Sequence, residues 1–404
     1  MKGVYPVEYF SNPHINKPIE EIYADIDAYS SEFFEDETDY HEGIDFVIPF
    51  PPLYYEGQFI KGMFFSQSAE FLLKLYPDLS KLFFSIANTM WTSYSWSQNA
   101  DAYMTCYKNQ HREDWFRRTN PDRGNKTFIP LQDADFTNEY TMYPLLGLEK
   151  DIDILCISRF QQLKNIPLIA KALKIYRQKY NHPIKMTYIV GKEFGVNFDG
   201  LDEHEKNQLR MIEEELIHPS DYIEFIPHVN YFELPKYYTR ARVLVLGALI
   251  EGKNRTIYEA MSCDTPVIVF NDFNKYARGG AMVFPEGAGL YCPQFDAESL
   301  ADTMHNIFTN QNSFSPRRKF LEVFGRKNFL NTCIESFPYY AENLPEYKQN
   351  RIYNNVWADM AICYNYQISL HDFLYSRNAA IQHVQGLTAI DKLIKFFYRR
   401  FGIR

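Results

Sequence analysis

The sequence lacks most of the features that assign a protein to a membrane, secreted or metal-bound class. It contains no uninterrupted run of about 18 apolar residues, which a membrane-spanning helix would need. Its first residues include no apolar segment typical of a signal peptide, so we expect a cytoplasmic protein. The six cysteines are scattered and form no CxxC pair, and therefore neither a disulfide framework nor a zinc site is predicted.

Positive charge is also in short supply. The 404 residues include 42 Lys and Arg against 51 Asp and Glu, which gives a formal net charge of −9. A nucleic-acid partner is not expected, because such binding needs a broad face of clustered Lys and Arg. One basic stretch, residues 390–404, combines apolar and basic side chains. It predicts either a helix lying peripherally on the inner face of a membrane or a terminal helix packed on its own protein.

Glycine-rich GxGxxG turns are absent from the first half of the chain, so no nucleotide is placed there. From residue 151 onwards, short apolar runs rich in β-branched residues alternate with helical patterns. The patterns predict strands at 153–160, 186–192, 222–229, 243–249 and 266–270, and helices at 165–180, 203–217, 232–241 and 254–263. This alternation predicts a doubly wound α/β domain with a parallel sheet, whose ligands bind beyond the carboxyl ends of the strands.

Two cations follow the first predicted strand of this domain. Arg159 ends the strand, and Lys164 precedes the helix at 165–180. Arginine offers a planar fork of N–H donors and lysine a mobile point charge. Together they suit a diphosphate whose charge increases when its bond to a sugar breaks. The alternative is an ordinary exposed strand-to-helix loop that happens to contain both residues.

A second polar segment, EGKNRTIYEAM, leads into the helix at 254–263. It places Glu251 in the loop and Glu259 within the helix. The free N–H groups and the dipole at the helix start favour an anion without a metal ion, so we expect a phosphate at Asn254 to Thr256. Glu259 is then expected to accept hydrogen bonds from a ribose diol, and Glu251 from sugar hydroxyls. Two solvated acids near a helix start are the simpler alternative.

In their order and spacing, these segments resemble the C-terminal domain of retaining glycosyltransferases of the GT-B fold, most closely glycosyltransferase family 4. The resemblance covers residues 151–308 and includes Gly191, YIEFIPHV and YYTRARVLVL. It is weaker in the N-terminal half, where it rests on ADAYMTCYKNQHREDWF and KTFIPLQDADF. It implies an α/β chain of two Rossmann-like domains that face each other across a cleft, with C-terminal helices crossing back.

The resemblance and the strand pattern together predict three regions. Residues 1–148 form an N-terminal Rossmann-like domain on the acceptor side, with short buried strands in GIDFVIPF, KLFFSIA, DAYMTCY and KTFIPL. Residues 149–330 form a second Rossmann-like domain on the side of the nucleotide-sugar donor. Residues 331–404 form a helical segment that packs back on the first domain.

The resemblance also implies a role for each site residue. Arg159 and Lys164 contact the donor diphosphate, and Glu251 contacts the transferred sugar; these three are the expected catalytic residues. Glu259 binds the ribose. The remaining donor-binding residues are expected to be Gly252, Lys253, Asn254, Arg255, Thr256, Pro227 and His228, with the nucleotide base near the last two.

This chain departs from the family pattern inside the second segment. The family usually has Phe, Gly and a small apolar residue where Lys253, Asn254 and Arg255 occur here. Asparagine tolerates a left-handed backbone better than most residues, so Asn254 is expected to replace the glycine. Lys253 and Arg255 either add cations to the donor site or face solvent.

Three DxD pairs raise the possibility of a metal site, because such pairs bind a metal with a nucleotide sugar in a different, single-domain transferase fold. They are Asp25 with Asp27, Asp133 with Asp135, and Asp151 with Asp153. No metal or other cofactor is expected, because the strand and helix order fits the metal-free fold. On the acceptor side, His14 and Trp91 are weaker candidates, and an ordinary loop histidine and a core aromatic are the simpler explanations.

The expected function is a retaining, metal-independent glycosyltransferase. It would move a sugar from a UDP- or GDP-sugar to a glycan or lipid-linked acceptor in the synthesis of envelope polysaccharide or glycoconjugates. Two alternatives stay open: a nucleotide-sugar epimerase of the same fold, and a catalytically degenerate protein that serves as a binding or scaffold subunit. A phosphorylase is disfavoured, because no motif for lysine-bound pyridoxal phosphate is present.

Overall fold

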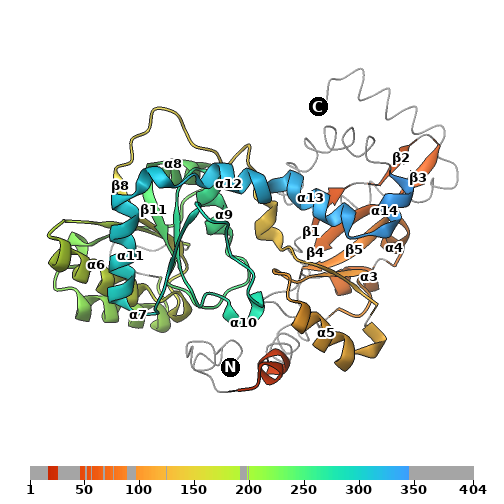
Figure 1. The fold of residues 1–404 in the computed structure, drawn as a ribbon, viewed down its shortest axis with the longest axis horizontal. Coiled ribbons are helices and arrows are strands. Elements are labelled where there is room, and N and C mark those ends of the chain that lie inside the picture. The colour runs from red at the N-terminus through yellow and green to blue at the C-terminus, as the bar shows by residue number, and fades with distance from the viewer. Residues whose placement is uncertain are drawn as a thin grey trace. The chain divides into compact units, whose positions relative to one another are not determined.

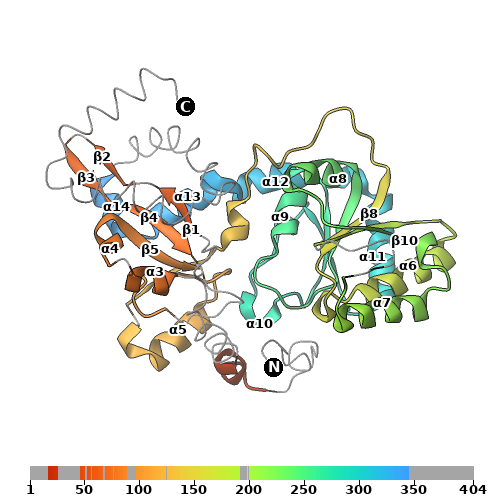
Figure 2. The same ribbon diagram turned by 180° about the vertical axis from the view of Figure 1, so that it is seen from behind.

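The computed structural model describes residues 17–25, 46–50, 52–55, 57–66, 69–75, 77–88, 97–123, 125–191, 198 and 200–344. The chain divides into two compact units (Figures 1 and 2). Unit 1 contains Asp133–Phe329. Unit 2 contains Glu20–Gln132, and the chain returns to it at Leu330. Unit 1 therefore begins upstream of the predicted boundary between residues 148 and 149.

A six-stranded parallel sheet forms the centre of unit 1, in the order β10-β9-β8-β11-β12-β13. The strands are β8 (Ile152–Ser158), β9 (Met186–Val190), β10 (Ile223–Ile226), β11 (Ala241–Val245), β12 (Val267–Phe270) and β13 (Gly289–Cys292). This is the strand order of the doubly wound Rossmann fold, and it reverses between β8 and β11. Ligands of such sheets bind beyond the carboxyl ends of the strands at the reversal.

Helices cover both faces of this sheet (Figure 1). The first face packs against α6 (Ile166–Tyr180), α7 (Glu203–Glu215) and α11 (Ala297–Thr309). The second packs against α8 (Leu234–Arg240), α9 (Arg255–Ser262) and α12 (Pro316–Val323). Neighbouring residues of a strand point to opposite faces, so Cys156 joins the first core and Leu155 the second. This two-sided burial explains why the strands are mostly apolar.

Polar side chains fix the starts of several of these helices. Asp202 and Glu205 form a reciprocal capping box at the start of α7. At the start of α11, Asp296 accepts a hydrogen bond from the Ser299 N–H at 2.7 Å. Asn165 precedes α6 in a left-handed conformation, with φ of 49°. These local signals account for the close agreement between the predicted and observed starts of the helices.

Unit 2 is built on a five-stranded sheet in the order β1-β4-β5-β6-β7, of which only β1 is antiparallel to its neighbour. The strands are β1 (Phe46–Phe50), β4 (Gly62–Ser66), β5 (Phe83–Asn88), β6 (Ala102–Met104) and β7 (Thr127–Ile129), and β2 (Leu53–Tyr55) and β3 (Gln58–Ile60) form a separate hairpin. The four strands predicted in this half correspond to β1, β5, β6 and β7, and the prediction missed β4.

Helices also cover both faces of the sheet of unit 2. One face packs against α3 (Ala69–Leu75), α4 (Leu79–Leu82) and α5 (Gln110–Thr119). On the other face, Phe84 of β5 stacks on Phe337 with ring centroids 4.7 Å apart. Tyr340 of α14 (Pro338–Asn343) donates a hydrogen bond to the Lys61 carbonyl at 2.9 Å. Residues beyond 344, including the basic stretch 390–404, lie outside the described residues.

Each unit thus contains a largely parallel sheet between helices, and the predicted α/β class with two Rossmann-like units is confirmed. Within the described residues, no helix has the length and apolar character needed to cross a membrane.

Close backbone contact joins the loops after β8 and β11. A Cβ atom on Gly247 would lie 2.5 Å from the Lys164 carbonyl oxygen and 3.1 Å from that of Asn165. The Asn165 amide donates a hydrogen bond to the Gly247 carbonyl at 2.9 Å. Only glycine leaves room for this approach, which positions Lys164 over the end of β11.

We therefore expect Gly247→Ala to lower the free energy of unfolding by about 1 to 3 kcal/mol, because backbone atoms must move to admit the methyl group. Denaturant titration of the purified protein measures this change. Gly191→Ala is the control, since its added methyl group would meet Arg159 Cγ at an ordinary 3.7 Å. Equal stability of the two variants would contradict the assigned contact.

Candidate active site

Two of the predicted catalytic residues, Lys164 and Glu251, meet at the carboxyl ends of β8 and β11. Lys164 ends a short 3-10 turn after β8, and its ammonium forms an ion pair with Oε1 of Glu251 in the loop after β11. The two side chains are 19% and 9% exposed. The pair thus lies at the reversal of strand order, where a doubly wound sheet binds its ligands.

Both carboxylate oxygens of Glu251 have partners. Oε2 accepts a hydrogen bond from the Asn254 amide, in addition to the Lys164 bond at Oε1. An ionised carboxylate has about four acceptor positions and an ammonium has three donors. Glu251 can therefore still accept hydrogen bonds from hydroxyl groups, and Lys164 can still donate to anionic oxygens.

Asn274, which the sequence analysis missed, holds the backbone of this loop. Its side chain accepts a hydrogen bond from the Glu251 N–H at 2.8 Å and donates one to the Gly252 carbonyl at 2.7 Å. Asn274 itself is buried and left-handed, with φ of 50°. Its position four residues after β12 was the available signal, because the carboxyl end of β12 belongs to the same edge of the sheet.

Arg159 directly follows β8 and is exposed. Its Cγ atom lies near Gly191, which directly follows β9. No carboxylate in the described part of the chain forms an ion pair with it. The guanidinium is therefore available to an anion at this edge of the sheet.

The structure corrects the expectation for Asn254. Its backbone is extended, with φ of −76°, so it does not replace a left-handed glycine. Instead it caps α9: Oδ1 accepts hydrogen bonds from the N–H and hydroxyl of Thr256 at 2.9 and 2.7 Å. The position expected for a phosphate oxygen at this helix start is thus filled by the side-chain oxygen of Asn254.

Lys253 and Arg255 pair with the two acids of one DxD sequence. Lys253 contacts both oxygens of Asp135 at 2.8 and 2.9 Å, and these side chains are only 7% and 2% exposed. Arg255 contacts Asp133 at 2.6 Å, with exposures of 43% and 24%. The Lys253 side chain therefore faces neither solvent nor an open donor site, and the charge of each cation is balanced by an aspartate.

Glu259 lies on the buried side of α9 and is 3% exposed. Its Oε2 accepts a hydrogen bond from the Tyr238 hydroxyl of α8 at 2.7 Å. Burial raises the pKa of Glu259 above its ordinary range, and this outweighs the opposing effects of Arg255, one helical turn earlier, and of Tyr238. Burial, together with the nearby Glu259 carboxylate, also raises the pKa of Tyr231 to about 12. Tyr231 and Tyr238 were missed, because tyrosines are frequent throughout this sequence.

For the remaining predicted residues, the structure gives only a position in the fold and a degree of exposure. Pro227 and His228 directly follow β10 and are half-buried and exposed, respectively, so they lie at the same edge of the sheet. Their role next to a nucleotide base stays a prediction. His14 and Trp91, the acceptor-side candidates, lie outside the described residues.

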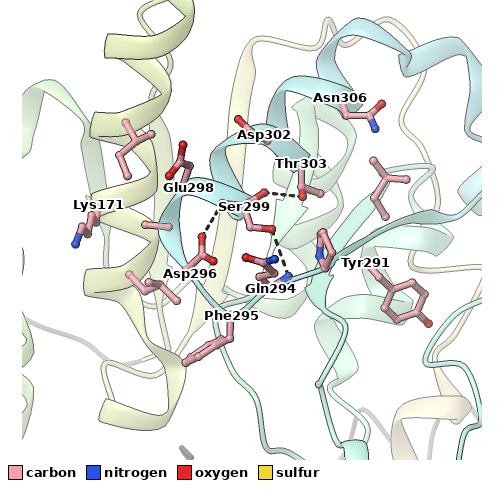
Figure 3. Close-up of a pocket in the computed structure, with 15 residues that line it drawn as sticks. Lys171, Tyr291, Gln294, Phe295, Asp296, Glu298, Ser299, Asp302, Thr303 and Asn306 are labelled. Atoms are coloured by element: carbon pink, nitrogen blue, oxygen red, sulfur yellow. Dashed lines mark hydrogen bonds between the residues drawn. The ribbon is translucent and has the colours of Figure 1, made fainter. Parts of the chain in front are cut away.

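A pocket of about 880 Å³ lies between α6 and α11, away from these residues (Figure 3). Lys171, Phe295, Asp296 and Asp302 are among its lining residues, and no predicted site residue lines it. The start of α11 beside it is already capped by Asp296. The candidate site is therefore placed at Lys164 and Glu251, on the basis of their charges and hydrogen bonds, and not at this pocket.

Within the residues described by the structure, no group of three or more His, Cys, Asp or Glu side chains is arranged to hold a metal ion. Cys156 lies in the core near the site, and burial raises the pKa of its thiol to about 12. A thiolate nucleophile is thus not expected at this position.

Comparison with known proteins identifies a domain within unit 1. Residues 145–326, less than half of the chain, match the model of the family "Glycosyl transferases group 1". No curated protein matches the sequence. The matched residues lie within unit 1 and include all the predicted donor-site residues.

Several solved structures resemble this chain at low sequence identity. Sucrose-phosphate synthase from Thermosynechococcus elongatus is 21% identical, with 63% of this chain and 66% of that chain covered and a TM-score of 0.45. TarM from S. aureus, in a complex that includes UDP, is 13% identical, with coverages of 63% and 51% and a TM-score of 0.47. Trehalose-6-phosphate synthase OtsA is 13% identical, with coverages of 65% and 69% and a TM-score of 0.47.

The chain thus spans about half to two thirds of the length of these solved proteins. Matches at this level identify neither a substrate nor a mechanism.

The environment of Glu259 generates a prediction about stability. Because the folded state raises the pKa of this carboxyl group, it binds the proton more tightly than the unfolded state does, and ionisation costs stability as the pH rises. We expect Glu259→Gln to be more stable than the wild type at pH 7. Denaturant titrations between pH 4 and 8 should show this advantage shrinking as the pH falls from the raised folded-state pKa towards the ordinary carboxyl pKa. A variant less stable than the wild type at pH 7 would contradict the assignment.

Proposed function

We propose that this protein is a retaining, metal-independent glycosyltransferase that moves a sugar from a UDP- or GDP-sugar to a glycan or lipid-linked acceptor. The synthesis of envelope polysaccharide or glycoconjugates is the proposed setting. The observation that carries the proposal is the Lys164–Glu251 pair at the strand reversal of a glycosyltransferase group 1 domain. A cation for a phosphate and an acceptor for a sugar hydroxyl lie side by side there.

The diphosphate of the donor is proposed to contact Arg159 and Lys164. Arg159 is exposed beside the end of β9, and Lys164 retains donors after its bond to Glu251. The dipole of α9 adds a favourable potential at its amino end. For a phosphate oxygen to reach the Thr256 N–H, the Asn254 side chain must leave its capping position.

The sugar and ribose are proposed to lie against the two glutamates. Glu251 accepts hydrogen bonds from hydroxyls of the transferred sugar through acceptor positions that Lys164 and Asn254 leave open. Glu259 accepts hydrogen bonds from the ribose diol. This hydrogen bonding would compensate for the burial of its charge, which the protein alone balances only in part.

The proposed reaction breaks the bond between the anomeric carbon and the diphosphate through an oxocarbenium-like transition state. The departing diphosphate takes the proton of the acceptor hydroxyl, which attacks on the same face, so that the anomeric configuration is retained. The protein mainly stabilises the charge that develops on the leaving group. Removal of one such donor costs roughly 2.7 to 4 kcal/mol in comparable sites, so Arg159 and Lys164 are each expected to be essential.

A nucleotide-sugar screen tests this function. UDP-, GDP-, ADP- and CMP-sugars are added to the protein with EDTA present, and thermal stability and nucleotide release are measured. We expect one nucleotide series to stabilise the protein and to be hydrolysed slowly. Arg159→Ala and Glu251→Gln should lower release by 100-fold or more, in line with roughly 2.7 kcal/mol per lost interaction.

The control is Arg240→Ala, because Arg240 forms an exposed pair with Asp151 at the opposite end of β8. It should release nucleotide at the wild-type rate. Proton NMR of the freshly released sugar should show the anomer of the donor, which tests retention. No response to any donor, with or without metal, would refute the enzyme and favour the scaffold alternative; epimerised donor would instead identify an epimerase.

A further inference from the structure

The segment that opens unit 1 contacts the loop of the proposed donor site. Asp133 and Asp135 belong to a 3-10 turn, Asp133–Phe136, at the point where the chain enters unit 1. They form ion pairs with Arg255 and Lys253, which are more than one hundred residues away in the sequence. From the sequence, no metal was expected at this DxD pair, and the two cations were expected either to add to the donor site or to face solvent.

The Asp135–Lys253 pair is almost fully buried, at 2% and 7% exposure. Removing two charges from water carries a desolvation penalty that their attraction often fails to exceed, so such a pair adds little net stability. It does impose a defined geometry, because neither charge tolerates separation from its partner in the interior. The ammonium of Lys253 therefore has one well-defined position.

This position matters because Lys253 lies between Glu251 and Asn254 in the chain. Glu251 pairs with Lys164, and Asn254 caps α9. Asn274 fixes the preceding backbone, at Glu251 and Gly252. Asp135 then fixes the loop at its middle. Asp135 thus adds an anchor to those at Glu251, Gly252 and Asn254.

We propose that Asp135 is a positioning residue for the nucleotide-sugar donor, and that Asp133 supports it through Arg255. Asp135 holds Lys253 so that Glu251 and the amino end of α9 keep the geometry that the sugar and the diphosphate require. Lys253 then contributes no net charge to the donor phosphates, which depend on Arg159 and Lys164. This inference rests on the proposed function and adds residues outside the predicted donor motif.

The same segment is itself firmly attached within unit 1. The Phe136 ring packs edge-on against Phe329, with centroids 5.0 Å apart. The Glu139 carboxylate accepts a hydrogen bond from the Arg326 N–H at 3.0 Å. The Arg317 guanidinium donates to the Glu139 carbonyl and also to the Ser262 carbonyl at the end of α9. The anchor for Lys253 is therefore a rigid part of unit 1 rather than a loose loop.

The test compares single variants with a double variant that removes both charges. Asp135→Asn and Lys253→Met each leave one buried charge alone, so both should unfold at a lower temperature. Asp135→Asn combined with Lys253→Met leaves no such charge and should recover much of the wild-type melting temperature. The double variant therefore separates a role in positioning from a role in folding.

The readout is the affinity for UDP relative to uridine, measured by calorimetry and competition, with GDP and guanosine in parallel. Uridine lacks the phosphates, so its affinity depends only on contacts with the nucleoside. In the folded double variant, we expect UDP affinity to fall about tenfold or more, as for the loss of hydrogen bonds to a charged group, while uridine affinity changes less than twofold. Lys253→Arg, which keeps the charge pair, should retain most of the UDP affinity.

The matched control is Asp151→Asn with Arg240→Met, an exposed pair with an Nε–Oδ1 distance of 2.7 Å in the same unit. Its removal should leave both affinities unchanged. A folded Asp135→Asn/Lys253→Met variant with the wild-type ratio of UDP to uridine affinity would overturn the positioning role. Wild-type protein that binds neither UDP nor GDP would refute the proposed function, and this inference with it.

Discussion

The reversal of strand order between β8 and β11 is the constraint on which the candidate site depends. The chain runs outward from β8 to β9 and β10, and then returns to place β11 on the other side of β8. The helices that follow these two neighbouring strands, α6 and α9, consequently lie on opposite faces of the sheet. Lys164 and Glu251, which are 87 residues apart in sequence, meet at this point, and Gly247 allows the close approach of the two loops.

Most of the cations around this point are paired with carboxylates of the protein. Lys164, Lys253 and Arg255 each pair with a carboxylate, whereas Arg159 is exposed without an ion pair among the described residues. The bond to Glu251 holds the Lys164 donors in place, whereas a phosphate oxygen reaches the Thr256 N–H only if the Asn254 side chain leaves its capping position. The buried carboxyl of Glu259 has the opposite character: its environment disfavours the charge that a ribose diol would stabilise.

Much of the architecture could be predicted from the sequence. The doubly buried strands of unit 1 are mostly apolar runs, so the first five, β8 to β12, were predicted in the correct order, whereas the edge strand β13 was missed. In unit 2 the short strand β4 was missed. Arg159, Lys164 and Glu251 were predicted at one edge of the sheet, because each lies at or shortly after the end of a predicted strand and parallel strands bring their carboxyl ends together; the structure places Lys164 and Glu251 in contact there.

The sequence by itself thus determined the α/β class, the order of elements in unit 1 and the edge of the sheet that carries the polar residues, because these follow from periodicity and local capping. Only the tertiary structure decided which charges face one another. Asp135 and Lys253 lie 118 residues apart, and no local pattern encodes their contact. Tertiary contacts also decided the extended backbone of Asn254. Its side chain caps α9 and donates a hydrogen bond to Glu251, and these two interactions outweigh the tolerance of asparagine for a left-handed conformation.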